Sequence, residues 1–262
     1  MIKKKYGFTL IELAVVLFII SLLMVGLLGP VATQIESRER QQTVDTMNDI
    51  MEALYGYAVI NGYLPCPDTD GDGTADPENT SGDCVVPGVG DGWLPWRTLG
   101  LNFQGDVWGN RFKYHVTAPD FTTVDNGVCA ADDNLDLCEV ADITIRTRAD
   151  NPGTGGIVES KFQYNVATNV PAIVISHGKN NLGATRVFDG GATAAATAGT
   201  DEEENDDANT DAIFYSRNFT EGGTGCTDDT DEANILCEFD DIVMWISPNI
   251  LMNRMVKAER LP

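Results

Sequence analysis

An almost wholly apolar run near the amino end constrains the fold of this chain more than any other feature. It extends from Phe8 to Leu28, 21 residues in which Glu12 is the single charged side chain. A helix rises about 1.5 Å per residue, so a run of this length matches the roughly 30 Å hydrocarbon core of a bilayer. We therefore expect a membrane-spanning amino-terminal helix over residues 8–30.

The distribution of charge orients this helix. Three lysines at positions 3–5 precede the run, whereas the whole chain has 40 acidic and 17 basic residues and a net charge of −23. Basic flanks stay in the cytoplasm, so the acidic remainder is expected on the far side of the membrane. The negative charge also argues against nucleic acid as a partner. A cleaved secretory signal or a plain signal anchor would share these features.

Glu12 favours a more specific interpretation over these two alternatives. A carboxylate inside an apolar span costs on the order of 3 kcal/mol unless it finds a partner, and a plain anchor has no use for it. The segment Lys5-Tyr6-Gly7 followed by Phe8-Thr9-Leu10-Ile11-Glu12-Leu13 resembles the class III signal of type IV prepilins and type II secretion pseudopilins. The resemblance implies that prepilin peptidase removes residues 1–7 after Gly7 and methylates the new amino group of Phe8.

The same resemblance implies how the chain assembles. In this family the glutamate at the position of Glu12 is thought to pair with the amino terminus of a neighbouring subunit, here that of Phe8. Two opposite charges that lose water together attract strongly, whereas either one alone is penalised. The implied partners are other pilin or pseudopilin subunits, prepilin peptidase, and inner-membrane lipid before assembly. The implied location is a single-pass inner-membrane protein with a periplasmic domain, later incorporated into a pilus or a periplasmic pseudopilus.

Beyond Pro30 the sequence predicts an amphipathic continuation of the helix over residues 31–63. Apolar residues recur every three or four positions, which places them on one helical face. They are Val44, Met47, Met51, Leu54 and Ala58. Asn61-Gly62 is a typical helix stop.

Residues 64–262 predict one globular domain with long loops. Short alternating segments indicate strands. They are Arg111–Thr117, Ala141–Thr147, Ile157–Val166, Ala172–Ser176, Ala212–Ser216 and Ile242–Ile246. The expected fold class is α+β, with the long amino-terminal helix packed on an antiparallel sheet whose long acidic loops are disulfide-bonded.

One acidic loop has the pattern of a calcium site. Asp68, Asp70, Asp72 and Asp76 alternate with small residues and glycines, an arrangement suited to a hard cation that prefers oxygen ligands. The spacing resembles the start of an EF-hand loop, although Asn79 occupies the place of the final glutamate and no helix pair flanks the segment. We predict calcium here. For the charge run Asp201–Glu204 a solvated surface is the expectation, with a second calcium site in the acidic loop at 201–211 as the alternative.

Six cysteines and an exported domain predict disulfides. Pairing of sequence neighbours is the simplest of the fifteen possible connectivities, and the first pair would close a loop around Asp68–Asp76. The neighbouring pairs are Cys66 with Cys84, Cys129 with Cys138, and Cys226 with Cys237.

No catalytic constellation is apparent, so we expect a protein that is not an enzyme. Ser176 and His177 adjoin at a strand exit, but the serine lacks the G-x-S-x-G elbow. The sequence thus favours a structural subunit, a minor pilin of a type IV pilus-like filament. The alternatives are a pseudopilin of a type II secretion system and a membrane-anchored calcium-binding adhesion module that does not polymerise.

Overall fold

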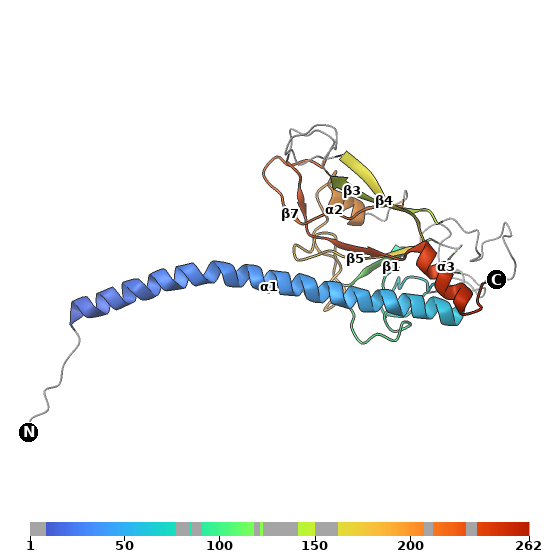
Figure 1. The fold of residues 1–262 in the computed structure, drawn as a ribbon, viewed down its shortest axis with the longest axis horizontal. Helices are drawn as coiled ribbons and strands as arrows, with labels where there is room; N and C mark the ends of the chain where they lie inside the picture. Colours follow the sequence, from blue (N-terminus) through green and yellow to red (C-terminus); the bar gives the residue numbers. More distant parts are fainter. Residues whose placement is uncertain are drawn as a thin grey trace, which may run out of the picture. The chain divides into compact units, whose positions relative to one another are not determined.

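The computed structural model describes residues 9–76, 84, 91–117, 121–122, 141–149, 162–206, 212–228 and 235–261, with backbone alone for 23–33, 149 and 162. The chain forms two compact units, Met1–Gln42 and Thr43–Pro262. Helix α1, Leu10–Asn61, is a single helix of 52 residues that crosses this boundary (Figure 1). In the part of the chain that the structure describes, no helix is both long enough and apolar enough to cross a bilayer, so the expected span at 8–30 is not confirmed.

Helix α1 ends where the sequence predicted. Gly62 adopts φ +93°, a left-handed conformation that glycine takes without steric cost, and its amide donates to the carbonyl of Ala58 at 2.8 Å. The predicted apolar face is also present. Met47, Met51, Leu54 and Ala58 are buried, and Val44 packs against them from a partly buried position.

Four antiparallel strands form the central sheet of the second unit, in the order β1-β2-β5-β9. Their bounds are β1 Asp91–Trp93, β2 Lys113–Val116, β5 Ala172–Ser176 and β9 Ile242–Trp245. β5 is buried throughout, as expected of a β-branched strand covered on both faces. Its alternate side chains enter different cores: Val174 packs with Leu54 of α1, whereas Ile173 and Ile175 pack with Phe214 of β6.

A second, three-stranded sheet covers the other face, in the order β4-β3-β6. Its strands are β3 Ile143–Ala149, β4 Phe162–Val170 and β6 Ile213–Tyr215. β3 pairs antiparallel with β4 but parallel with β6, so this second sheet is mixed, whereas the sheet that packs on α1 is antiparallel as predicted. A parallel neighbour needs a long crossover, and the chain between β3 and β6 includes β4, β5 and α2, Asp201–Asp206.

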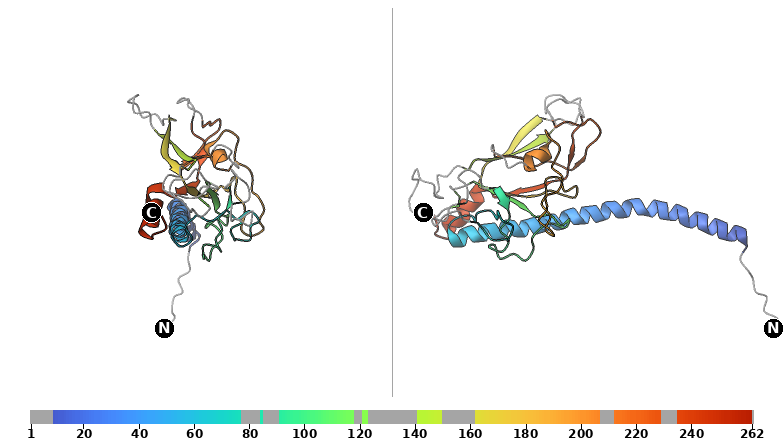
Figure 2. Two further views of the ribbon diagram at one scale, coloured as in Figure 1. Left: turned by 90° about the vertical axis from the view of Figure 1, so that its right-hand side faces the viewer. Right: turned by 180° about the vertical axis from the view of Figure 1, so that it is seen from behind.

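The carboxyl end of the chain closes against the second half of α1. Helix α3, Pro248–Lys257, lies beside the end of α1 in both views of Figure 2. The Arg254 guanidinium donates to both carboxylate oxygens of Glu52 at 2.8 Å, and the Ser247 amide donates to the Tyr55 hydroxyl at 3.0 Å. Arg260 donates to the carbonyls of Val59 and Ile60, two acceptors that the helix end leaves unpaired.

Short pairings and disulfides fasten the remaining loops. β7, Thr220–Glu221, pairs with β8, Glu238–Phe239. The predicted bonds Cys66–Cys84 and Cys226–Cys237 are both present. Cys129 and Cys138 lie outside the described residues.

Candidate functional site

The processing signal and its first helical turn form the first functional element. Gly7 and Phe8 lie outside the described residues. Thr9 is the residue before α1 and Glu12 is the third residue within it. The amide and the hydroxyl of Thr9 each donate to Glu12 Oε2 at 2.8 Å, and the Glu12 amide donates to Thr9 Oγ1 at 3.3 Å. This reciprocal arrangement is a capping box, which satisfies free donors at a helix start.

The first described turns of α1 expose an apolar surface in their own unit. The side chains of its members are 42% to 86% exposed. A contiguous apolar surface of this kind is rare on proteins that are surrounded by water alone. They are Leu10, Ile11, Leu13, Val15, Val16, Leu17, Phe18, Ile19, Ile20 and Leu22. We call these residues the apolar collar; such a surface is suited to lipid or to other helices.

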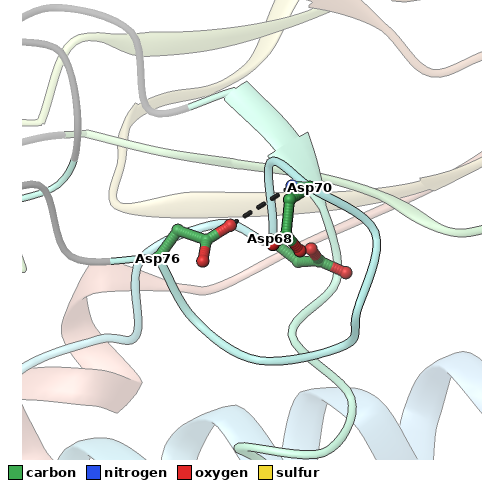
Figure 3. A group of neighbouring side chains, drawn as sticks. All are labelled: Asp68, Asp70 and Asp76. Carbon is green, nitrogen blue, oxygen red and sulfur yellow. Dashed lines mark hydrogen bonds between the residues drawn. The ribbon is translucent and has the colours of Figure 1, made fainter.

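The second candidate is the acidic loop after the first cysteine. Asp68, Asp70 and Asp76 each place one carboxylate oxygen within 4.8 Å of the others, and Figure 3 shows them around one turn of the chain. The dashed line is the hydrogen bond from the Asp70 amide to Asp76 Oδ2, 3.3 Å long. Asp72 lies in the same loop but outside this group of three, because its Oδ1 accepts the amide and hydroxyl of Thr74 at 2.7 and 2.6 Å.

Backbone amides organise the loop around Asp68. Its Oδ1 accepts the Gly71 amide at 2.6 Å and its Oδ2 the Gly73 amide at 2.8 Å. Burial raises the pKa of Asp68, and these two hydrogen bonds oppose the rise. Gly73 has φ +88°, and a Cβ there would lie 2.3 Å from Nε1 of Trp96, so the turn at this place requires glycine.

The arrangement can hold a cation with oxygen ligands. Three carboxylates converge, and the Cys66–Cys84 bond encloses the segment. Asn79 lies outside the described residues, so the far end of the EF-hand-like spacing has no structural description. The calcium assignment for Asp68, Asp70, Asp72 and Asp76 stays a prediction.

The structure also brings together acidic residues that the sequence reasoning did not combine. Glu202 of α2 joins Asp240 and Asp241, which precede β9, and each offers an oxygen within 4.8 Å of the others. All three are buried, as is Asp201. The expected solvated surface for Asp201–Glu204 is therefore wrong for Asp201 and Glu202.

Tertiary contacts explain why the start of this charge run is inside. Arg148 donates to Asp201 through Nε at 2.8 Å and Nη2 at 2.7 Å, and Arg217 Nε lies 2.8 Å from Asp201 Oδ2. Arg217 also contacts Asp228 at 3.3 Å. The charges of two arginines thus compensate the charges of two aspartates in the interior. Buried carboxylates require such compensation.

The structure shows no hydrogen bond between the described side chains of Ser176 and His177. The Ser176 hydroxyl donates to Asp106 Oδ2 at 2.7 Å, which fastens the loop before β2 to the end of β5. His177 Nδ1 lies 3.6 Å from Asp241 Oδ1. Ser176 and His177 therefore contact two different aspartates, Asp106 and Asp241.

Comparison with protein families identifies the class of the amino-terminal signal. Residues 2–28 match the family model of the prokaryotic N-terminal methylation motif. This motif is the prepilin signal of type IV pilins and pseudopilins, as the resemblance of residues 5–13 implied.

The motif supports a type IV pilin-like or pseudopilin-like protein, anchored in the cell envelope by its amino end. It implies processing by prepilin peptidase and assembly with other pilin subunits, and it favours a structural role over catalysis. No curated protein and no solved structure matches the chain at a significant level.

Proposed function

We propose that this protein is a structural subunit, a minor pilin, of a type IV pilus-like filament. The observation that carries the proposal is the methylation motif at residues 2–28, which includes the start of helix α1 and the whole apolar collar. Prepilin peptidase cleaves after Gly7 and methylates Phe8. The subunit then has a new amino terminus at the end of a helix that is ready to pack with others.

The apolar collar has two successive environments in this proposal. Before assembly the collar lies in inner-membrane lipid, and after assembly it lies against the helices of neighbouring subunits. Both remove the exposed apolar side chains from water at about 25 cal/mol per Å² of apolar surface. The acidic second unit remains outside the membrane, with calcium bound by the Asp68–Asp76 loop.

Glu12 supplies specificity to this packing. In the single subunit its carboxylate already accepts two hydrogen bonds from Thr9. A neighbouring amino terminus at Phe8 adds a positive charge to a carboxylate that is already held in place by the capping box. Charge-assisted hydrogen bonds of this kind are stronger than neutral ones, above all where water is excluded.

A pseudopilin of a type II secretion system would carry the same motif. The segment Trp108-Gly109-Asn110 favours this second candidate, because it is similar to a segment of the major pseudopilin. The two candidates differ in where the fibre lies. A pilus subunit is recovered in material sheared from the cell surface, whereas a pseudopilin remains with the envelope.

The test is the amino-terminal sequence and intact mass of the protein from its own host, in membranes and in the sheared fraction. A chain that starts at methylated Phe8 and is present in the sheared fraction supports the minor pilin. The same chain in membranes alone supports the pseudopilin.

An intact Met1 or a cut near Ala32 would overturn both filament proposals and leave the anchored or secreted calcium-binding module. In parallel, Glu12→Ala should abolish incorporation into fibres, whereas an anchored module that does not polymerise would be indifferent to it.

A further inference from the structure

The register of the central sheet creates a buried meeting point at one end of β5 and β9. Ser176 pairs with Ile242 as the last rung of this antiparallel ladder. The next residues along each strand are His177 and Asp241, so the pairing brings them face to face at 3.6 Å. Asp240 follows at the same edge, where its Oδ2 accepts the amides of Lys179 and Asn180 at 2.7 Å.

Glu202 enters this meeting point from α2. Its Oε1 accepts the Asp240 amide at 2.9 Å, and the side-chain amide of Asn180 donates to both of its carboxylate oxygens at 3.0 and 3.1 Å. With Asp241 these acids form what we call the inner cluster: Glu202, Asp240 and Asp241, which are 2%, 4% and 2% exposed. The three carboxylates therefore converge where they are almost completely shielded from bulk water.

Glu202 and Asp241 differ from the neighbouring acids in the charge of their partners. Asp201 and Asp228 have arginine partners, as described above. Among the described residues, the side-chain donors to Glu202 and Asp241 are the neutral amides of Asn180 and Asn205. Neutral amides orient a carboxylate but do not cancel its charge, and a buried charge without compensation is strongly unfavourable.

Two buried atoms at the cluster lack hydrogen bonds. Asp241 Oδ1 and His177 Nδ1 each have no hydrogen-bond partner among the described residues, although both side chains are more than nine-tenths buried. His177 Nδ1 faces Asp241 Oδ1 and so points toward the cluster. Buried polar atoms are almost always satisfied, and an ion is one of the partners that accounts for such an exception.

The cluster also has an approach from outside. A cavity of about 680 Å³ is lined by Glu202 together with Gly199, Gly222, Thr227 and Asp228. Glu202 therefore borders the cavity and belongs to the inner cluster at the same time. A binding site for an ion needs such an entry path.

We propose that Glu202, Asp240 and Asp241 bind a hard divalent cation of the calcium type, beside His177, whose Nδ1 faces Asp241 Oδ1. Calcium takes oxygen ligands at about 2.3–2.6 Å, so two ligands of one ion are at most about 5 Å apart. The three oxygens lie within 4.8 Å of one another, inside this limit. The cation supplies a positive charge beside Glu202 and Asp241, whose side-chain amide donors are neutral. This site is separate from the Asp68 loop and depends on neither that loop nor the filament role.

The test counts calcium ions bound to the full-length chain, purified in detergent and freed of metal with a chelator. Isothermal titration compares the wild type with Glu202→Gln and Asp241→Asn, which keep the shape of each side chain and remove its charge. Asp189→Asn, at an exposed carboxylate outside both acidic groups, is the matched control. We expect both cluster variants to bind one ion fewer than the wild type, and the control to bind the same number.

The variant Asp70→Asn with Asp76→Asn separates this site from the Asp68 loop. If calcium at the loop fails, this double variant titrates like the wild type, and the inner cluster still loses its ion on Asp241→Asn. If the inner cluster fails, Glu202→Gln and Asp241→Asn bind as many ions as the wild type. That result overturns the present proposal and does not affect the calcium assignment to the Asp68 loop.

A second measurement needs no variant in the cluster, in case such variants fold poorly. Hydrogen exchange of the full-length chain, with Asp70→Asn and Asp76→Asn in place, is compared with and without calcium. We expect exchange at the amides of Lys179, Asn180 and Asp240 to slow at least tenfold when calcium is added. Unchanged exchange at these three amides would overturn the proposal.

Discussion

Thr9 and Glu12 hydrogen-bond to each other in both directions across the first turn of α1. Glu12 is therefore not an unsatisfied carboxylate in the single subunit, although the sequence presents it as an isolated charge in an apolar run. The proposed pairing of Glu12 with a neighbouring amino terminus therefore builds on an existing cap. The observed cap and the proposed charge pair can be separated by substitution.

We predict that Thr9→Val weakens the start of α1 by about 1 kcal/mol, the usual cost of losing a capping side chain, while Glu12 keeps its charge. Fibre incorporation should fall by a modest factor, whereas Glu12→Ala should abolish it. The measurement is the amount of subunit in sheared or pelleted fibres, relative to the amount in membranes. Equal losses for Thr9→Val and Glu12→Ala would show that the cap alone matters and that no intersubunit charge pair forms.

We predict that Gly73→Ala disrupts the Asp68 loop. A Cβ at this position meets the Trp96 indole, and φ +88° is strained for alanine. The nearby indole also gives a readout, because a terbium ion bound in the loop would be sensitised by Trp96. We expect terbium luminescence excited through tryptophan in the wild type and its loss in Gly73→Ala and in Asp70→Ala.

Gly100→Ala is the matched control for this loop, since Gly100 also has positive φ but has nothing within 4 Å of the added atom. It should keep the luminescence. Undiminished luminescence in Asp70→Ala would contradict the calcium assignment to residues 68–76.

In the absence of divalent cations we predict that stability falls as pH rises through the neutral range. Burial, followed by the charge of Asp241, raises the pKa of Glu202 from 4.5 to about 8, and burial raises that of Asp240 from 3.8 to about 6. The folded state therefore binds more protons than the unfolded state between about pH 4 and 8, and its stability is greatest below this range.

Chemical denaturation in a chelator, at several pH values, measures this dependence. Glu202→Gln should flatten the decline, because an amide has no proton to lose. A stability that is constant or rises from pH 5 to pH 8 in the wild type would contradict the prediction.

Local patterns in the sequence predicted the elements that depend on neighbours along the chain. Strand β5, Ala172–Ser176, has the predicted bounds, and α1 ends at Asn61 before Gly62 as predicted. The carboxylates at positions 68, 70 and 76 are close in sequence, so their convergence could also be anticipated. Turns and helix faces are determined by residues that lie within a few positions of one another in the sequence.

The inner cluster could not be predicted in this way. It requires the register of β5 with β9, which sets His177 opposite Asp241, and the placement of α2 through Asn205. A shift of one residue in this register would send Asp241 to the other face of the sheet. The acidic sequence before Ile242 was the available signal, but only in combination with that register.

The core contact between α1 and the central sheet gives a stability prediction. Leu54 is fully buried, so Leu54→Ala should destabilise the second unit by about 2–5 kcal/mol. Glu52 lies two positions earlier and pairs with Arg254 on the surface, so Glu52→Ala should cost about 1 kcal/mol or less. Thermal or chemical unfolding of the full-length chain measures both, and equal costs would contradict the packing described here.

The Cys226–Cys237 bond closes the loop that borders the cavity beside Glu202. Replacing both cysteines with serine should lower the free energy of unfolding by about 2–4 kcal/mol. Calcium binding to the inner cluster should weaken as well, since Asp228 accepts the Cys237 amide at 3.0 Å in the same wall. Calorimetric titration of this variant checks the coupling, and unchanged affinity would show that the loop and the cluster are independent.

The contacts of Arg254 and Arg260 with α1 join residues that are 200 to 202 positions apart in sequence. The end of α1 therefore lacks these partners until residue 260 has been synthesised. Contacts of such sequence separation slow folding, because the intervening chain must first be ordered. Under the proposed function, a subunit becomes competent to join a fibre only after residue 260 has reached the same side of the membrane as the end of α1.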